Sequence, residues 1–219
     1  MLGSYTLSKC LDLPWQDQFT WHPLNLDLDR GHCTWDMHQN FTANGIYELP
    51  FGKGRPFMNQ GGVANAFLGG WKVAAIAALR SGPWLSLASS QSLGTFVNAL
   101  PNVSGPVNNP NLHGGLGKKG YIGPYFNTQN VTKITTVGVQ GNAGVANLYG
   151  PGSATWDLSG DKAWSFRERY VLTFRADAFN AFNRVNFNGL SNNVTSSTFG
   201  QLTSANPART LQLSLRINF

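Results

Sequence analysis

The stretch Arg209-Thr-Leu-Gln-Leu-Ser-Leu-Arg-Ile-Asn-Phe219 decides the fold class of this chain. From Leu211 to Phe219 apolar residues occupy every second position, and polar residues fill the positions between them. This period of two indicates a β-strand with one apolar and one polar face. Such a strand fits the sheet of a soluble protein that has one wet face, or the wall of a membrane barrel. The aromatic last residue favours the barrel, because aromatic rings anchor strands at the membrane interface.

The composition of the chain points the same way. Only 12% of the 219 residues are charged, about half the usual share. The 25 glycines, 14 Phe, 7 Trp and 6 Tyr suit many strands joined by polar loops rather than a helical enzyme. The longest apolar run, residues 73–79, is too short to cross a bilayer as a helix. Insertion into a membrane therefore requires strands.

Period-two alternation predicts five further strands, and with the last one they form an all-β antiparallel set of about six. Most are longer than the usual strand of about 5–6 residues and suit tilted membrane strands of about 9–11 residues. The motif Ser81-Gly-Pro83 interrupts one run, as either a tight turn between two strands or a bulge in one long strand. The predicted strands cover residues 2–9, 36–49, 70–88, 154–164, 169–183 and 207–219.

The connections between these strands fall into two kinds. Only residues 165–168 join two of the strands, whereas 89–153 and 184–206 are long and rich in polar residues. Outer-membrane barrels have short periplasmic turns and long extracellular loops. We therefore expect a long extracellular loop at about 89–153, with 10–35 on the same side and 50–69 on the periplasmic side.

Six strands cannot close a membrane barrel, since known barrels begin at about eight. The N-terminal residues also lack the basic region and apolar core of a signal peptide. We therefore expect residues 1–219 to be a partial barrel that belongs to a longer chain.

Several stretches together resemble the C-terminal end of an Oar-like TonB-dependent receptor. Family members carry an N-terminal carboxypeptidase-regulatory-like domain, a plug and a barrel of about 22 strands, and this chain shows only barrel-like sequence. The resembling stretches are residues 4–12, 46–55, 68–73, 80–83, 174–183, 185–187, 198–203 and the closing Leu-Arg-Ile-Asn-Phe.

The resemblance implies a location in the cell outer membrane and a parent protein that takes up a substrate in a TonB-dependent manner. The implied partners are outer-membrane lipid, the barrel-assembly machinery and the TonB system, the last through N-terminal regions that this chain lacks. It also implies that the final strand, with Leu215, Ile217 and Phe219, is the assembly signal that the insertion machinery reads. The alternative is a secreted, soluble β-protein that binds glycans through aromatic, Trp-rich loops.

The two cysteines, Cys10 and Cys33, bracket a polar segment. If strands flank that segment, both thiols lie near the same end, and a disulfide would agree with an oxidising compartment. Two unrelated free thiols are the other interpretation.

No catalytic, metal or cofactor motif emerges from the sequence. The four histidines lack metal-ligand spacing, and the basic residues behind the net charge of +6 are scattered, which argues against a nucleic-acid partner. Asp157, Asp161, Arg175 and Asp177 fall on one predicted face, where cross-strand ion pairing explains them better than acid–base catalysis. We therefore expect no enzyme activity, no cofactor and no metal.

Overall fold

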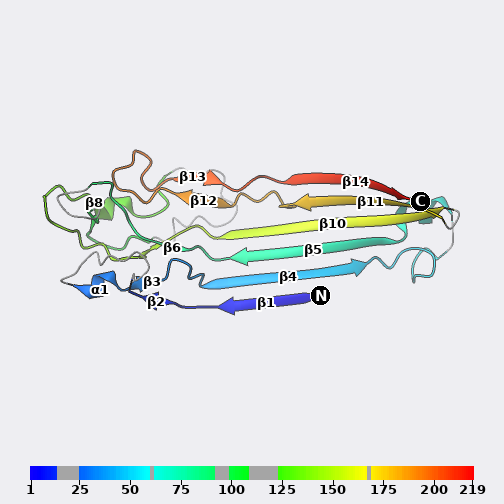
Figure 1. Ribbon diagram of the computed structural model, residues 1–219, viewed down its shortest axis with the longest axis horizontal. Coiled ribbons are helices and arrows are strands. Elements are labelled where there is room, and N and C mark those ends of the chain that lie inside the picture. Colours follow the sequence, from blue (N-terminus) through cyan, green and yellow to red (C-terminus); the bar gives the residue numbers. More distant parts are fainter. Residues whose placement is uncertain (14–24, 60–61, 92–98, 109–122, 167–168) are drawn as a thin grey trace.

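The computed structural model describes residues 1–13, 25–59, 62–91, 99–108, 123–166 and 169–219. Its main feature is a six-stranded antiparallel sheet in the order β1-β4-β5-β10-β11-β14. Figure 1 shows these strands running side by side along the length of the molecule. The prediction of about six antiparallel strands is confirmed. Their bounds are β1 Leu2–Leu7, β4 Gln39–Glu48, β5 Trp71–Arg80, β10 Ser153–Phe166, β11 Tyr170–Phe179 and β14 Thr210–Asn218.

The predicted strand over 70–88 is shorter than expected. Strand β5 ends at Arg80, and Gly82 then lies so close to Gly150 that a Cβ on Gly82 would collide with the Gly150 carbonyl oxygen. The chain continues into β6 (Trp84–Leu85), which pairs with β9 (Leu148–Tyr149) outside the main sheet. The motif at 81–83 is therefore an exit from the sheet, neither a hairpin turn nor a bulge.

A compact region, here called the cap, covers one end of the sheet. It comprises the described residues of segments 8–38, 81–152 and 180–209. Figure 1 shows its short elements gathered at the end opposite the C-terminus. Besides β6 and β9 these elements are β2 Leu11–Asp12, α1 Leu26–Asp29, β3 Gly31–His32, β7 Asn102–Val103, η2 Thr128–Asn130, β8 Val131–Thr132, β12 Phe187–Leu190 and β13 Leu202–Ala205.

The cap has a hydrophobic core of its own. Phe126 and Leu148 are fully buried, and the ring of Phe126 meets that of Phe199 edge to face at 5.2 Å between centroids. Segments far apart in the sequence therefore fold together, and the predicted loop at 89–153 is structured wherever it is described. The core residues are Leu87, Leu100, Val107, Tyr125, Phe126, Val131, Ala143 and Leu148.

The six-stranded sheet, in contrast, has almost no core. Among the described residues, Ala77 and Ala154 are the only buried hydrophobic residues that lie in its strands. A soluble sheet is stabilised by packing one face against another layer. This sheet lacks such a layer within the described chain, so its stability depends on what surrounds it.

The end opposite the cap carries the connection between β4 and β5, residues 49–70. It includes the short helix α2 (Val63–Leu68). No helix in the described part of the chain is long and apolar enough to cross a membrane.

Candidate functional site

The strand register sorts the side chains of the sheet into two faces. One row of register partners runs from Leu213 through Ala176, Gly160 and Val73 to Tyr47, across five strands. The neighbouring row on the same face joins Leu211, Ala178, Leu158, Ala75 and Gly45. Because partners in a ladder share a face, every one of these side chains lies on a single apolar surface.

The apolar face is widely exposed, most of all on the edge strand β14. Leu211 is 67% exposed, Leu213 70% and Leu215 64%. A long edge strand with a row of exposed aliphatic side chains would make a soluble protein aggregate. The same surface is what a barrel presents to the hydrocarbon of a membrane.

The opposite face is predominantly polar, with exposed apolar exceptions at Ile46 and Ile76, and it carries an alternating row of charges. Across β4, β5, β10 and β11, the register partners are Glu48, Lys72, Asp161 and Arg175 in that order. The Lys72 Nζ atom lies 3.4 Å from a Glu48 carboxylate oxygen on the neighbouring strand. Such a face suits a watery lumen.

The prediction of cross-strand ion pairing for the acidic residues needs a correction. The Arg175 guanidinium binds Asp177, two residues along the same strand, with Nε 2.9 Å from Oδ2. Asp157 accepts a hydrogen bond at 2.9 Å from the backbone N–H of Asn180. Side chains two apart in a strand share a face, so Arg175 reaches Asp177 without crossing to another strand.

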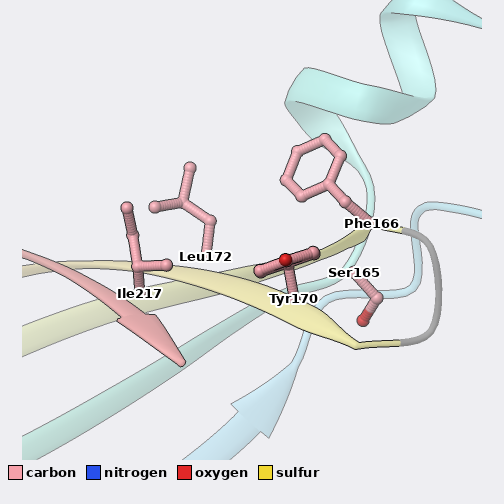
Figure 2. Close-up of a pocket in the computed structure, with 5 residues that line it drawn as sticks. All are labelled: Ser165, Phe166, Tyr170, Leu172 and Ile217. Atoms are coloured by element: carbon pink, nitrogen blue, oxygen red, sulfur yellow. The ribbon is translucent and has the colours of Figure 1, made fainter. Parts of the chain in front are cut away.

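Aromatic side chains line the apolar face near the end opposite the cap. Phe166 and Tyr170 are register partners at the tip of the β10–β11 hairpin. Figure 2 shows them with Leu172 and Ile217 around an open depression of about 660 Å³ that also touches Ser165. Aromatic rings at the end of a barrel wall fit the membrane–water interface.

The connection 49–70 brings two of the resembling stretches, 46–55 and 68–73, into one structure. The Gly70 N–H donates to the carbonyl oxygen of Phe51 at 3.0 Å. Gly52 has φ +123°, and a Cβ on Gly69 would lie 2.8 Å from the Gly52 Cα atom. Side chains at either glycine would separate the two segments, so the glycines permit this close approach.

Lys162 is a residue that the sequence reasoning missed. It lies on the apolar face, in register with Trp71 and Phe174, yet it is only 3% exposed. Its ammonium donates to the carbonyl oxygen of Gly69 and lies 3.5 Å from that of Asn65. The sequence does contain a signal for its unusual role, because Lys162 is a charged residue at a position where the alternation predicts an apolar one.

In the cap, Cys10 and Cys33 form a disulfide, with their Cα atoms 5.4 Å apart. It joins the chain leaving β1 to the chain that approaches β4. Next to it, the buried Asp36 accepts hydrogen bonds from the Ser8 hydroxyl at 2.9 Å and from His32 Nδ1 at 3.1 Å. Burial alone would raise the pKa of Asp36, but hydrogen bonds from the Cys10 backbone, Ser8 and His32 outweigh it and lower the pKa below 3.8.

The histidines are placed as structural residues where the chain is described. His32 stacks on Trp84 at 3.8 Å between centroids, and His38 Nδ1 lies 2.9 Å from the carbonyl oxygen of Ser8. His22 and His113 lie outside the described residues. Within the described ranges, no three His, Cys, Asp or Glu side chains form a group that could hold a metal ion.

Of the residues expected to form the assembly signal, two lie on the apolar face of β14 and the third follows the strand. Leu215 and Ile217 pair with Phe174 and Leu172 of β11, and Phe219 follows the strand with 91% of its surface exposed. The other edge of β14 has no partner strand among the described residues. The structure thus places these residues at an open edge of the sheet, and their role as a signal stays a prediction.

Comparison with known proteins identifies the family. A family model described as an outer membrane beta barrel domain matches residues 1–212, nearly the whole chain. The chain therefore belongs to the outer membrane beta barrel domain family, and its place is the outer membrane. The search of curated proteins and the search of solved structures each found no match.

Proposed function

We propose that this chain is the C-terminal segment of an Oar-like, TonB-dependent receptor whose barrel takes up a substrate across the outer membrane. The observation that carries the proposal is the open sheet. Six strands are too few for a barrel of about eight or more, and β1 and β14 each have one edge without a partner strand in the described chain. Lipid cannot satisfy the backbone groups of an open edge, so further strands have to complete the wall.

The two ends of the sheet support an orientation for this segment. The β10–β11 connection is short, whereas the loops at the other end form the folded cap. In outer-membrane barrels, short turns face the periplasm and long loops face outside. The cap is then extracellular, and its disulfide fits an oxidising compartment.

Receptor function is supported by the resemblance of ordered motifs and by the polar face. The row from Glu48 to Arg175 lines the side that would face the lumen, where a plug and a passing substrate would meet charged side chains. The soluble, glycan-binding alternative is disfavoured, because family membership places the chain in a membrane wall and the apolar face is exposed.

The proposal is tested first on the gene and then on the protein. The reading frame upstream of the Met1 codon is expected to encode a plug and about sixteen further strands, which would bring the total near that of large outer-membrane transporters. The parent protein, purified from outer membranes, is expected to retain the TonB protein, whereas a variant without the upstream region does not.

Two results would contradict different parts of the proposal. An in-frame stop codon just upstream of Met1 would contradict the segment assignment. A complete parent protein that never retains TonB would contradict the assignment as a TonB-dependent receptor. The assignment as an outer-membrane barrel would still hold.

A further inference from the structure

The connection 49–70 places helix α2 on the outer wall of the barrel. Lys162 and Trp164 belong to the apolar face, since they are register partners of Phe174 and Leu172. Both side chains contact α2 or its C-terminal cap: the Trp164 indole N–H donates to the Ala66 carbonyl oxygen at 2.6 Å, and Lys162 to that of Gly69. The helix therefore lies over the lipid-facing side of the sheet rather than over the lumen.

Lys162 explains why the helix is held there. A charged side chain on the lipid face of a barrel strand is destabilising unless it is covered. The ammonium instead meets the backbone carbonyls at the C-terminal end of α2, where the helix dipole favours a cation. The rings of Trp164 and Trp71 flank it, with centroids 5.2 Å and 6.0 Å from Nζ.

Two further hydrogen bonds hold α2 against the neighbouring segments. The Trp71 indole N–H donates to the Phe67 carbonyl oxygen at 2.8 Å. The Asn65 side-chain oxygen accepts from the Lys53 N–H at 3.1 Å, which joins α2 to the segment that follows β4. With its backbone carbonyls turned toward the sheet, α2 has a fixed place on the wall.

The outward side of α2 is apolar and has nothing to pack against in the described chain. Val63 is 76% exposed, Phe67 67% and Leu68 58%. Figure 2 shows the helix on the same side of the sheet as Phe166, Leu172 and Ile217, which line the adjoining depression. The exposed surface of α2 is thus continuous with the face that meets lipid.

We propose that α2 is an interfacial anchor, held on the barrel wall by Lys162, that inserts Val63, Phe67 and Leu68 into phospholipid at the boundary between headgroups and acyl chains. Short apolar surfaces of this kind bind at that depth. The assignment to a lipid-facing wall rests on family membership, and the assignment to the periplasmic leaflet rests on the orientation under the proposed function.

A depth measurement tests the anchor in the complete encoded protein, purified from outer membranes. A fluorophore is attached at Phe67→Cys, at Leu213→Cys on the lipid face, or at Lys72→Cys on the polar face next to Trp71. Each protein is placed in phosphatidylethanolamine–phosphatidylglycerol vesicles that contain phosphatidylcholine spin-labelled either near the headgroup or in the middle of the acyl chain. Cys10 and Cys33 do not react, because they form a disulfide.

The expected result is loss of emission at Phe67 with the headgroup spin label and at Leu213 with the acyl-chain spin label, with emission at Lys72 retained in both. Emission retained at Phe67 while Leu213 is quenched would overturn the anchor and leave the barrel intact. Emission retained at all three positions would overturn the lipid-facing wall, and with it both this inference and the proposed function.

Lys162→Met tests the role of the lysine with the same labels. Methionine is apolar and suits the lipid-facing side of the strand, so the barrel is expected to fold. Quenching of the Leu213 label verifies that the barrel has folded. The Phe67 label is expected to lose most of its quenching, because α2 is no longer held. Lys72→Met is the matched control and is expected to change nothing at Phe67. Unchanged quenching at Phe67 in Lys162→Met would overturn the holding role of Lys162.

Discussion

Leu213 of the edge strand β14 and Ala176 of β11 are register partners, on the face that also carries Gly160 and Val73. The next residue along β14, Ser214, pairs with Arg175 on the opposite, polar face. Two adjacent residues of one strand thus meet different surroundings, hydrocarbon for Leu213 and water for Ser214.

This difference predicts the effect of a charge at each position. Leu213→Arg is expected to reduce the free energy of folding into a bilayer by about 2–4 kcal/mol, whereas Ser214→Arg is expected to have little effect. The measurement is denaturant unfolding of the complete encoded protein in liposomes. Equal tolerance at both positions would contradict the assignment of the two faces.

The disulfide in the cap is expected in protein extracted from membranes. Cys10 and Cys33 are 23 residues apart, and a link of this span typically contributes about 2–4 kcal/mol. Mass spectrometry of peptides prepared without reduction is expected to find the two cysteines joined, and the double Cys→Ser variant is expected to expose the cap to protease. Two thiols that alkylate freely would contradict the link.

The low pKa of Asp36 predicts that the cap loosens in acid. A group with a folded pKa below its unfolded value stabilises the fold above the unfolded pKa, and that contribution is lost as the pH falls through the folded pKa. The protection of residues 31–36 against hydrogen exchange, taken relative to the intrinsic exchange rate at each pH, should therefore be high at neutral pH and fall below about pH 4. Asp36→Asn removes the titrating group, so its protection should lack this acid-dependent fall. The same fall in the variant would assign it to another group.

The core of the cap is expected to depend on Phe126, which is fully buried. Phe126→Ala should destabilise the cap by about 3–5 kcal/mol, because it removes a large ring from a packed core. Limited proteolysis should then cut segment 123–153 faster, with the strands still protected. Val137→Ala, at a 72% exposed position, is the control and should behave as the parent protein. Equal cleavage of both variants would argue that the cap does not depend on this core.

The end of β14 is expected to act in assembly. Phe219→Asp, or deletion of Phe219, should leave the complete encoded protein in the periplasm as an unfolded, protease-sensitive species, because β14 then fails to enter and close the sheet. Asn218→Asp changes a neighbouring residue on the polar face and should be assembled normally. Cell-surface labelling with fractionation separates these outcomes. Normal surface display of Phe219→Asp would count against the assembly role and against closure through β14.

The sequence by itself determined the sheet and its two faces. Alternation with a period of two is a local property. The residues from Leu211 to Phe219 therefore specify a strand with one apolar and one polar face independently of the rest of the chain. The same reasoning placed β4, β10 and β11 correctly, along with the shared face of Asp157 and Arg175. It also found two cysteines at the ends of one polar segment, which the structure joins.

Only the tertiary structure decided the cap and the cover over Lys162. The cap core joins Leu87, Phe126, Leu148 and Phe199, residues from distant segments with no period to relate them. The sequence marks Lys162 as a charge in an apolar row, but its partners are backbone carbonyls of α2 and of the glycine that follows it, about ninety residues earlier in the chain. Backbone carbonyls carry no signature in the sequence, and long-range contacts form only when the register of the strands brings the segments together. The local sequence pattern therefore specified the strands of the sheet. Three-dimensional packing specified the cap at one end and the position of α2 over Lys162.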